Sequence, residues 1–118
     1  DSLLVFLDDQ GGHLKGEVEA LLNALTQHGI SYELTTNPGY KMSAAFRGVL
    51  ALSDNDLDNV LLCHQAKRLK PEIRTIARCS RKVYRVIFHE QGVDKVISGA
   101  VASTVINAAL EIFKPKKA

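Results

Sequence analysis

The chain has 118 residues, of which 46% are hydrophobic and 24% charged, and its formal net charge is +2. This length suffices to bury the core of one domain, whereas so small a charge does not create the basic field that nucleic-acid binding needs. The longest apolar runs, residues 3–7 and 49–52, are far shorter than the roughly 20 residues that span a bilayer. We therefore expect one soluble domain, residues 1–118, that binds no nucleic acid.

The first half of the chain predicts three strands and one helix. Residues 3–7 are continuously apolar, which is typical of a strand buried on both faces of a parallel sheet. After a loop, apolar residues recur at helical spacing from Leu14 to Leu25, and Gly29 is placed to end that helix. The β-branched and aromatic residues of 30–36 predict the next strand, and 48–52 predict another short buried strand.

The second half continues the alternation of helix and strand. A helix is predicted from about Leu57 to Lys70, because Pro71 disfavours helical geometry in the residue before it. A strand at 73–78 follows, then a helix that we expect Ser80 to cap and Gly92 to end. The last elements are a strand at 95–97 and an amphipathic helix at 101–113. The alternation predicts an α/β fold, a Rossmann-like three-layer α/β/α arrangement with a mostly parallel sheet.

A polar stretch, Ser53-Asp54-Asn55-Asp56, directly follows the strand at 48–52. In an α/β sheet the ligand crevice lies at the carboxyl ends of the strands. The same side chains could also cap the following helix and interact favourably with its dipole, each effect being worth about 0.5–1 kcal/mol. The stretch is therefore either part of a ligand site or a helix cap.

The segment VLALSDNDLDNVLLCHQAKRLKPEIRTIARC, followed by QGVDKVIS, carries a family resemblance. It resembles the second half of the regulator-of-potassium-conductance domain, also called RCK, KTN or TrkA-N. The pattern of that family is an apolar strand, a loop rich in Thr, Ser and Asp, a helix containing Asn, a strand ending in Ala-Arg, a helix, and Gly-Ala/Val-Asp-x-Val-Ile-Ser. The match covers roughly residues 48–109.

The resemblance implies a non-enzymatic, ligand-sensing domain that regulates a potassium channel or transporter from the cytoplasmic side of the membrane. It implies as partners other copies of the domain, in a homodimer or higher oligomer, and a membrane-embedded potassium pore or transporter subunit. Because the sequence begins almost directly in a strand and ends in a short basic tail, we expect a domain excised from a larger chain.

The resemblance also implies a binding site for an adenine nucleotide, NAD or ATP/ADP, as the cofactor. It places adenine- and ribose-contacting groups on Ser53, Asp54 and Asn55, and a ligand-facing arginine at Arg78. Asp54 and Asp56 are in addition candidate ligands of a divalent cation, although the glycine and glutamate of a calcium-binding EF-hand loop are missing.

The candidate phosphate loop contains Gly11, Gly12 and Gly16. Dinucleotide-binding domains have G-x-G-x-x-G here, because the glycines allow the backbone to approach the pyrophosphate. Aligning Gly11 and Gly16 with the first and third glycines puts His13 in the middle position, so the motif is degenerate and conventional dinucleotide binding is disfavoured.

Two further features keep alternatives open. Residues 37–46 leave about ten positions where the family usually has a helix and a third strand, so either this version is trimmed and lacks that strand or residues are absent from the chain. The degenerate motif allows an RCK domain that acts only as an assembly surface. A small NAD(P)-dependent oxidoreductase is a weaker alternative, because no residue pair has credible acid–base spacing.

Overall fold

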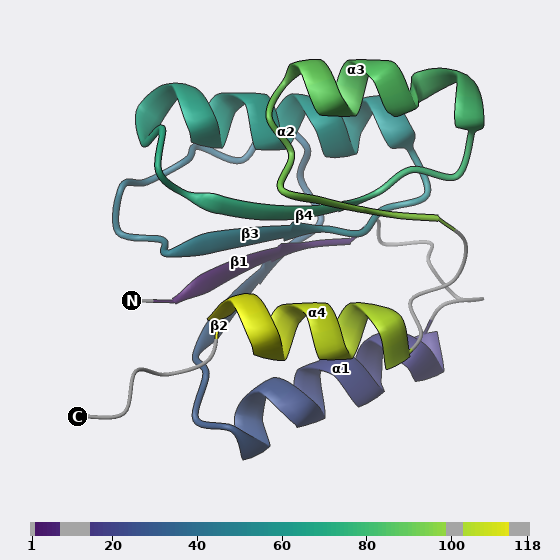
Figure 1. Cartoon of the computed structure of the whole chain (residues 1–118). Coiled ribbons are helices and arrows are strands. Elements are labelled where there is room, and N and C mark those ends of the chain that lie inside the picture. Colours follow the sequence, from purple (N-terminus) through teal and green to yellow (C-terminus); the bar gives the residue numbers. More distant parts are fainter. Residues whose placement is uncertain (1, 8–14, 99–102, 114–118) are drawn as a thin grey trace.

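The computed structural model describes residues 2–7, 15–98 and 103–113, which form a five-stranded parallel sheet with helices on both faces (Figure 1). The elements in chain order are β1 (Leu3–Phe6), α1 (Lys15–Gln27), β2 (Tyr32–Thr35), β3 (Gly48–Ala51), α2 (Asp56–Leu69), β4 (Arg74–Arg78), the 3-10 helix η2 (Lys82–Tyr84), α3 (Arg85–Glu90), β5 (Lys95–Ile97) and α4 (Ser103–Phe113). The predicted α/β class is confirmed and each predicted strand is present, whereas the single helix predicted between residues 80 and 92 is the 3-10 helix η2 followed by the short α3.

The strand order is β2-β1-β3-β4-β5, and every neighbouring pair is parallel. This is the flavodoxin-like order of a doubly wound sheet, whose direction of winding reverses between β1 and β3. In the sheet that the described residues form, no strand lies beyond β2, in keeping with the expectation that a third strand is lacking. The carboxyl ends of β1, β3 and β4 lie at one edge of the sheet.

Side chains alternate between two cores, one on each face of the sheet. Figure 1 shows α1 and α4 on one face of the sheet and α2 and α3 on the other. Leu3 and Val5 of β1 belong to the core shared with α1 and α4, whereas Leu4 and Phe6 belong to the core shared with α2 and α3. Helix α4 packs very closely on the start of β3: a Cβ added at Gly48 would lie 2.1 Å from the Phe113 ring. Glycine at this position therefore lets the helix approach the sheet.

The connection from β2 to β3, residues 36–47, crosses the sheet without a helix. Its side chains Tyr40, Met42 and Phe46 pack on the core that α2 and α3 also cover. The Lys70 amino group, at the end of α2, donates to the Phe46 carbonyl at 3.2 Å. A loop anchored in this way replaces the crossover helix, which explains how so short an interval connects two strands on opposite sides of β1.

Glycines with positive φ end two of the helices, as predicted. Gly29 (φ 71°) follows α1 and Gly92 (φ 75°) follows α3. At the first of these, the Ile30 N–H donates to the Leu25 carbonyl at 2.9 Å, which is the C-terminal pattern that glycine favours. Within the described residues, no helix combines the length and the hydropathy needed to cross a membrane.

Candidate functional site

Asn55 is the N-cap of α2. Its backbone is extended and its Oδ1 accepts a hydrogen bond from the Asp58 N–H at 3.0 Å. The Asn55 N–H donates in turn to the Ser53 hydroxyl oxygen at 3.2 Å. Such a cap is worth about 1 kcal/mol. Capping therefore accounts for one residue of the polar stretch and leaves Ser53, Asp54 and Asp56 to be explained by other contacts.

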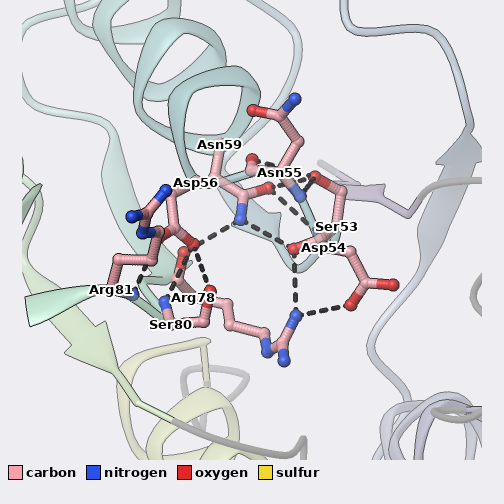
Figure 2. A network of polar contacts seen from close by, with 8 residues as sticks. All are labelled: Ser53, Asp54, Asn55, Asp56, Asn59, Arg78, Ser80 and Arg81. Atoms are coloured by element: carbon pink, nitrogen blue, oxygen red, sulfur yellow. Dashed lines mark hydrogen bonds and ion pairs between the residues drawn. The ribbon is translucent and has the colours of Figure 1, made fainter.

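Asn59 ties the carboxyl ends of β3 and β4 together. This side chain is fully buried, and its Oδ1 accepts from the Ser53 N–H at 3.0 Å and lies 2.9 Å from the Ser53 hydroxyl. Its Nδ2 donates to the carbonyl of Ser53 at 3.0 Å and to that of Arg78 at 2.9 Å (Figure 2). A buried amide with all these partners is satisfied, so it fixes the two strand ends relative to each other.

Arg78 and Asp54, which the family resemblance placed in one site, lie in direct contact. The Arg78 Nη1 donates to Asp54 Oδ1 at 2.7 Å and to the Ser53 carbonyl at 3.3 Å (Figure 2). The Arg78 side chain is 10% exposed and that of Asp54 is 37% exposed. The buried cation is thus held by a charge-assisted pair whose carboxylate faces solvent.

Asp56 anchors the loop that follows β4. Its carboxylate accepts hydrogen bonds from the N–H of Ser80 at 2.8 Å, the hydroxyl of Ser80 at 3.0 Å and the N–H of Arg81 at 2.8 Å. The prediction that Ser80 caps the next helix is wrong: that helix begins at Lys82 with Arg81 in the N-cap position. Ser80 does not cap that helix because its N–H and hydroxyl both donate to the Asp56 carboxylate (Figure 2).

A pocket of about 470 Å³ lies between the loop after β3 and the loop after β4. It is lined by Asp54, Asn55, Asp56, Leu57, Ser80, Arg81 and Tyr84. The Arg81 guanidinium carbon lies 5.6 Å from the centre of the Tyr84 ring, within the range of a cation–π contact. The pocket thus offers carboxylate and amide acceptors, one aromatic ring, one apolar side chain and one cation.

Two buried cysteines flank this region, and neither is in a disulfide. Burial raises the pKa of Cys79, and the negative charge of Asp56 raises it further. Burial raises the pKa of Cys63 to about 12. Both thiols are therefore protonated at neutral pH, which makes them poor nucleophiles and poor metal ligands.

The remaining predicted residues are placed as follows. Gly11 and Gly12 lie outside the described residues. Gly16 is in the first turn of α1, where an added Cβ would meet nothing within 4 Å, so packing alone does not require a glycine there. Of the residues that the structure describes, no three or more of the His, Cys, Asp and Glu type are grouped so that they could hold a metal ion. Cation binding by Asp54 and Asp56 stays a prediction.

Sequence reasoning named Ser53, Asp54, Asn55 and Arg78 but missed Asn59, Arg81 and Tyr84. Asn59 carried a signal, because asparagine is a weak helix former and here stands inside a helix, directly before the apolar residues 60–62. Nothing in the sequence around Arg81 and Tyr84 indicated a part in the site. Their part in the pocket depends on the path of the loop after β4, which Asp56 fixes from a distant position in the chain.

Comparison with known proteins bears on the same residues. Residues 43–99 match the sequence profile of the TrkA-N domain. The TrkA-N resemblance is confirmed for this segment. The TrkA-N segment contains β3, α2, β4, α3 and β5, and with them every residue of the pocket. A comparison with curated proteins finds no match.

Solved structures share the fold. The GsuK RCK domain superposes with a TM-score of 0.59 at 17% identity, over 96% of this chain and 28% of that chain. The signal receiver domain of a response regulator from Colwellia psychrerythraea 34H superposes with a TM-score of 0.71 at 12% identity, over 98% of this chain and 100% of that chain. The HemR receiver domain from Leptospira biflexa superposes with a TM-score of 0.69 at 16% identity, over 100% of this chain and 98% of that chain. Identities this low show the fold alone.

Proposed function

We propose that this chain is a regulatory domain of a potassium transport system and senses a ligand at the carboxyl ends of β3 and β4. The observation that carries the proposal is that a pocket with mixed acceptor, aromatic and cationic walls lies wholly within the TrkA-N segment. The family is regulatory and generally non-enzymatic, and it acts at the cytoplasmic face of the membrane. No reaction is therefore proposed for this domain.

The ligand we propose is an adenine nucleotide. Leu57 and Tyr84 provide apolar and aromatic surface for a base, while Asp54 and Asn55 provide acceptors for ribose hydroxyls. Arg81 supplies a positive charge for a phosphate. Binding in this way does not need the degenerate glycine loop, because all five side chains come from the β3 and β4 ends. A divalent cation held by Asp54 and Asp56 is the alternative ligand.

Ligand binding would act on the pair between Arg78 and Asp54. A ligand shifts an equilibrium only if it binds one arrangement more tightly than the other. The Asp54 carboxylate is 37% exposed and lines the pocket, so a bound ribose would compete with Arg78 for its oxygens. Because Asn59 joins the Arg78 carbonyl to Ser53, a change at this pair is transmitted to both strand ends.

Thermal unfolding with ATP, ADP, NAD, Mg²⁺ or Ca²⁺ added separately tests this proposal. A ligand at 100 times its Kd stabilises the folded state by about 2.7 kcal/mol, which raises Tm by several degrees in a domain of this size. We expect Arg81→Ala to weaken nucleotide binding roughly tenfold or more, since it removes a charged hydrogen bond. Arg68→Ala, an exposed arginine further along α2, is the matched control. Unchanged Tm with every ligand would contradict a sensing role.

A specific observation also favours the second candidate function, assembly. Helix α2 and the η2–α3 segment expose large apolar side chains, here named the α2–α3 apolar patch: Leu57 (48% exposed), Leu61 (47%), Val83 (71%), Val86 (64%) and Ile87 (37%). Several such residues close together mark an interaction surface more often than a free one. We propose that the patch binds a second copy of the domain.

The charges beside the patch support a second copy as its occupant. Acidic residues lie at the start of α2, with Asp54 and Asp58 near Leu57 in the chain, whereas η2 and α3 carry Arg81, Lys82 and Arg85. A twofold interface pairs a surface with itself, so it requires a surface that is self-complementary. Acidic and basic ends on adjoining helices meet that requirement.

Sedimentation velocity over a range of protein concentrations tests assembly. We expect wild type to dimerise and Val83→Glu to weaken the dimer at least tenfold, because a charge would be buried in the interface. Leu34→Glu is the matched control: Leu34 is 49% exposed but lies on β2, in register with Val5, on the sheet face that α1 and α4 cover. A wild-type chain that stays monomeric at all concentrations would rule out this surface.

A further inference from the structure

A second pocket, of about 410 Å³, lies at the amino ends of β4 and β5, whereas the pocket described above lies at the carboxyl ends of β3 and β4. The two pockets have no lining residue in common. Arg74 is the first residue of β4, Lys95 is the first residue of β5, and Asp94 directly precedes Lys95. Helix α4 supplies the other walls. We name this the amino-end pocket.

The first residues of β4 and β5 place positive charge on the face of the sheet that α4 covers. Side chains alternate along a strand, so Arg74 lies on the same face as Ile76. Lys95 lies on the same face as Ile97 for the same reason. Both isoleucines belong to the core shared with α1 and α4, and Figure 1 shows α4 along this face. The two cations therefore border the space between the sheet and α4.

Helix α4 contributes one polar and one apolar row to the amino-end pocket. Residues four positions apart lie on one side of a helix, so Asn107 and Glu111 form the polar row. Ala108 and Ile112 form the apolar row beside it. Ala108 is 9% exposed, and Ile112 is half-buried against the core. The pocket thus combines an apolar wall with charged groups of both signs.

Arg74 keeps most of its hydrogen-bonding capacity. The Asp94 carboxylate already accepts from the Lys67 amino group at 3.0 Å and from the Thr75 N–H at 2.8 Å. Arg74 approaches Asp94 with Nε at 3.7 Å, which is too long for a hydrogen bond. The Arg74 side chain is 54% exposed and, within the described part of the chain, donates no hydrogen bond. Its two Nη groups can therefore bind a carboxylate in the bidentate manner.

Lys95 and Glu111 line the amino-end pocket with opposite charges but do not pair with each other. Neither side chain forms an ion pair or a hydrogen bond with any residue in the ranges 2–7, 15–98 and 103–113. A simple anion in this pocket would meet the negative charge of Glu111, and a simple cation would meet the positive charges of Arg74 and Lys95. A small molecule that carries both charges complements both walls at once.

We infer that the amino-end pocket binds a free aliphatic α-amino acid. Arg74 and Lys95 hold its carboxylate, and the Glu111 carboxylate holds its ammonium group. Its aliphatic side chain packs on Ala108 and Ile112. The pocket volume of about 410 Å³ falls in the range of roughly 300–1,000 Å³ that is usual for small-molecule sites. This ligand is distinct from the proposed nucleotide, and its site does not depend on nucleotide binding.

Calorimetric titration of the chain with leucine tests the inference, because two analogues of leucine each lack one of its charges. The analogue 4-methylpentanoate has no ammonium group, and 3-methylbutylamine has no carboxylate. We expect leucine to bind and each analogue to bind about tenfold more weakly or worse, since each loses a charge-assisted hydrogen bond.

Substitutions assign each preference to its wall. Glu111→Gln should remove the preference for leucine over 4-methylpentanoate, because the ammonium group loses its partner. Arg74→Gln should remove the preference for leucine over 3-methylbutylamine, and Lys95→Gln should reduce the same preference without disturbing Asp94. All three side chains are exposed, so the variants should fold. Glu72→Gln is the matched control: Glu72 is exposed, lies two positions before Arg74 and does not line the pocket, so leucine affinity should be unchanged.

Three results would each overturn the inference. The first is a wild-type chain that gives neither binding heat nor a rise in Tm with leucine. The second is equal affinity for leucine and both analogues, and the third is a Glu111→Gln variant that keeps the full preference for leucine over 4-methylpentanoate. ADP titration of Glu111→Gln should match wild type, so loss of the amino-acid site leaves the proposed nucleotide site standing.

Discussion

Two aspartates, one near each end of β4, have the same structural task. Asp56 accepts hydrogen bonds from the N–H groups of Ser80 and Arg81, just after the strand. Asp94 accepts one from the N–H of Thr75, near the start of the strand, at 2.8 Å. Each carboxylate thus joins its own part of the chain to one end of β4, which is far from it in the sequence. Each also borders a pocket, with a volume of about 470 Å³ at Asp56 and about 410 Å³ at Asp94.

Their charged neighbours differ. The Lys67 amino group lies 3.0 Å from the Asp94 carboxylate and Arg74 Nε lies 3.7 Å from it, so opposite charges at this end compensate each other. At the other end Asp56 is satisfied by N–H and O–H groups, while the guanidinium of Arg81 extends over the Tyr84 ring in the pocket. The carboxyl end of β4 therefore presents to its pocket a guanidinium that contacts an aromatic ring, whereas the cations at the amino end lie against the Asp94 carboxylate.

Removing the side-chain amide of Asn59 should destabilise the carboxyl ends of β3 and β4 more than any other substitution considered below. Asn59→Ala removes the side-chain partner of the buried Ser53 N–H and Arg78 carbonyl, and leaves the Ser53 carbonyl with the longer bond from Arg78 Nη1. We expect the free energy of unfolding to fall by about 3 kcal/mol, measured by urea denaturation, because each unsatisfied buried group costs about 1–3 kcal/mol. Asn107→Ala, at an exposed position of α4, should change it by less than about 0.5 kcal/mol. A loss for Asn59→Ala as small as this control would show that Asn59 does not hold the strand ends.

The order of the elements was predictable from sequence because each element has a local signal. Continuous apolar runs gave the strands at 3–7 and 48–52, and β-branched and aromatic residues gave the strand at 30–36. Helical periodicity gave the helices, and Gly29 and Gly92 marked two helix ends. The strand order was less accessible, because nothing local distinguishes the flavodoxin-like order from other doubly wound orders. It depends on the path of residues 36–47 across the sheet.

The site was predictable only in part, for the same reason. Ser53, Asp54 and Asn55 follow a recognisable strand, and Arg78 ends another. Ser80 looked like a helix cap because serine before a helical segment is a common capping pattern. Its hydroxyl instead donates to Asp56, a residue 24 positions earlier in the chain, and no local pattern reports such a contact.

Replacing Asp56 by asparagine distinguishes the two ends of β4. Asparagine keeps one acceptor but turns an NH₂ group toward an N–H donor, so we expect stability to fall by about 2 kcal/mol. ADP affinity should fall as well, because the loop that carries Arg81 and Tyr84 loses its anchor. Asp94→Asn should leave ADP affinity unchanged. Calorimetric titration of both variants provides the measurement, and an equal loss of affinity in both would show that the two ends do not differ in this way.

Replacing Asp94 by asparagine should have the smallest effect on stability, about 1 kcal/mol at neutral pH, because solvent screens a carboxylate that is 26% exposed. Burial alone would raise the pKa of Asp94, but the hydrogen bonds from Lys67 and Thr75 outweigh it and hold this pKa below its usual value of 3.8. Since the folded-state pKa is the lower one, the carboxylate stabilises the fold above the unfolded-state value, and this contribution is lost as pH falls through the folded-state value.

The difference in unfolding free energy between wild type and Asp94→Asn should therefore stay constant from about pH 7 to pH 5 and shrink below about pH 4, where carboxylates in the unfolded chain become protonated. Urea denaturation across this range measures it, with Glu90→Gln as a control at an exposed carboxylate. A difference that grows on acidification would mean that burial rather than Lys67 dominates at Asp94. The Asp94 carboxylate would then destabilise the fold despite its two cationic neighbours. The difference between Asp94 and Asp56 would in that case lie in packing and not in charge.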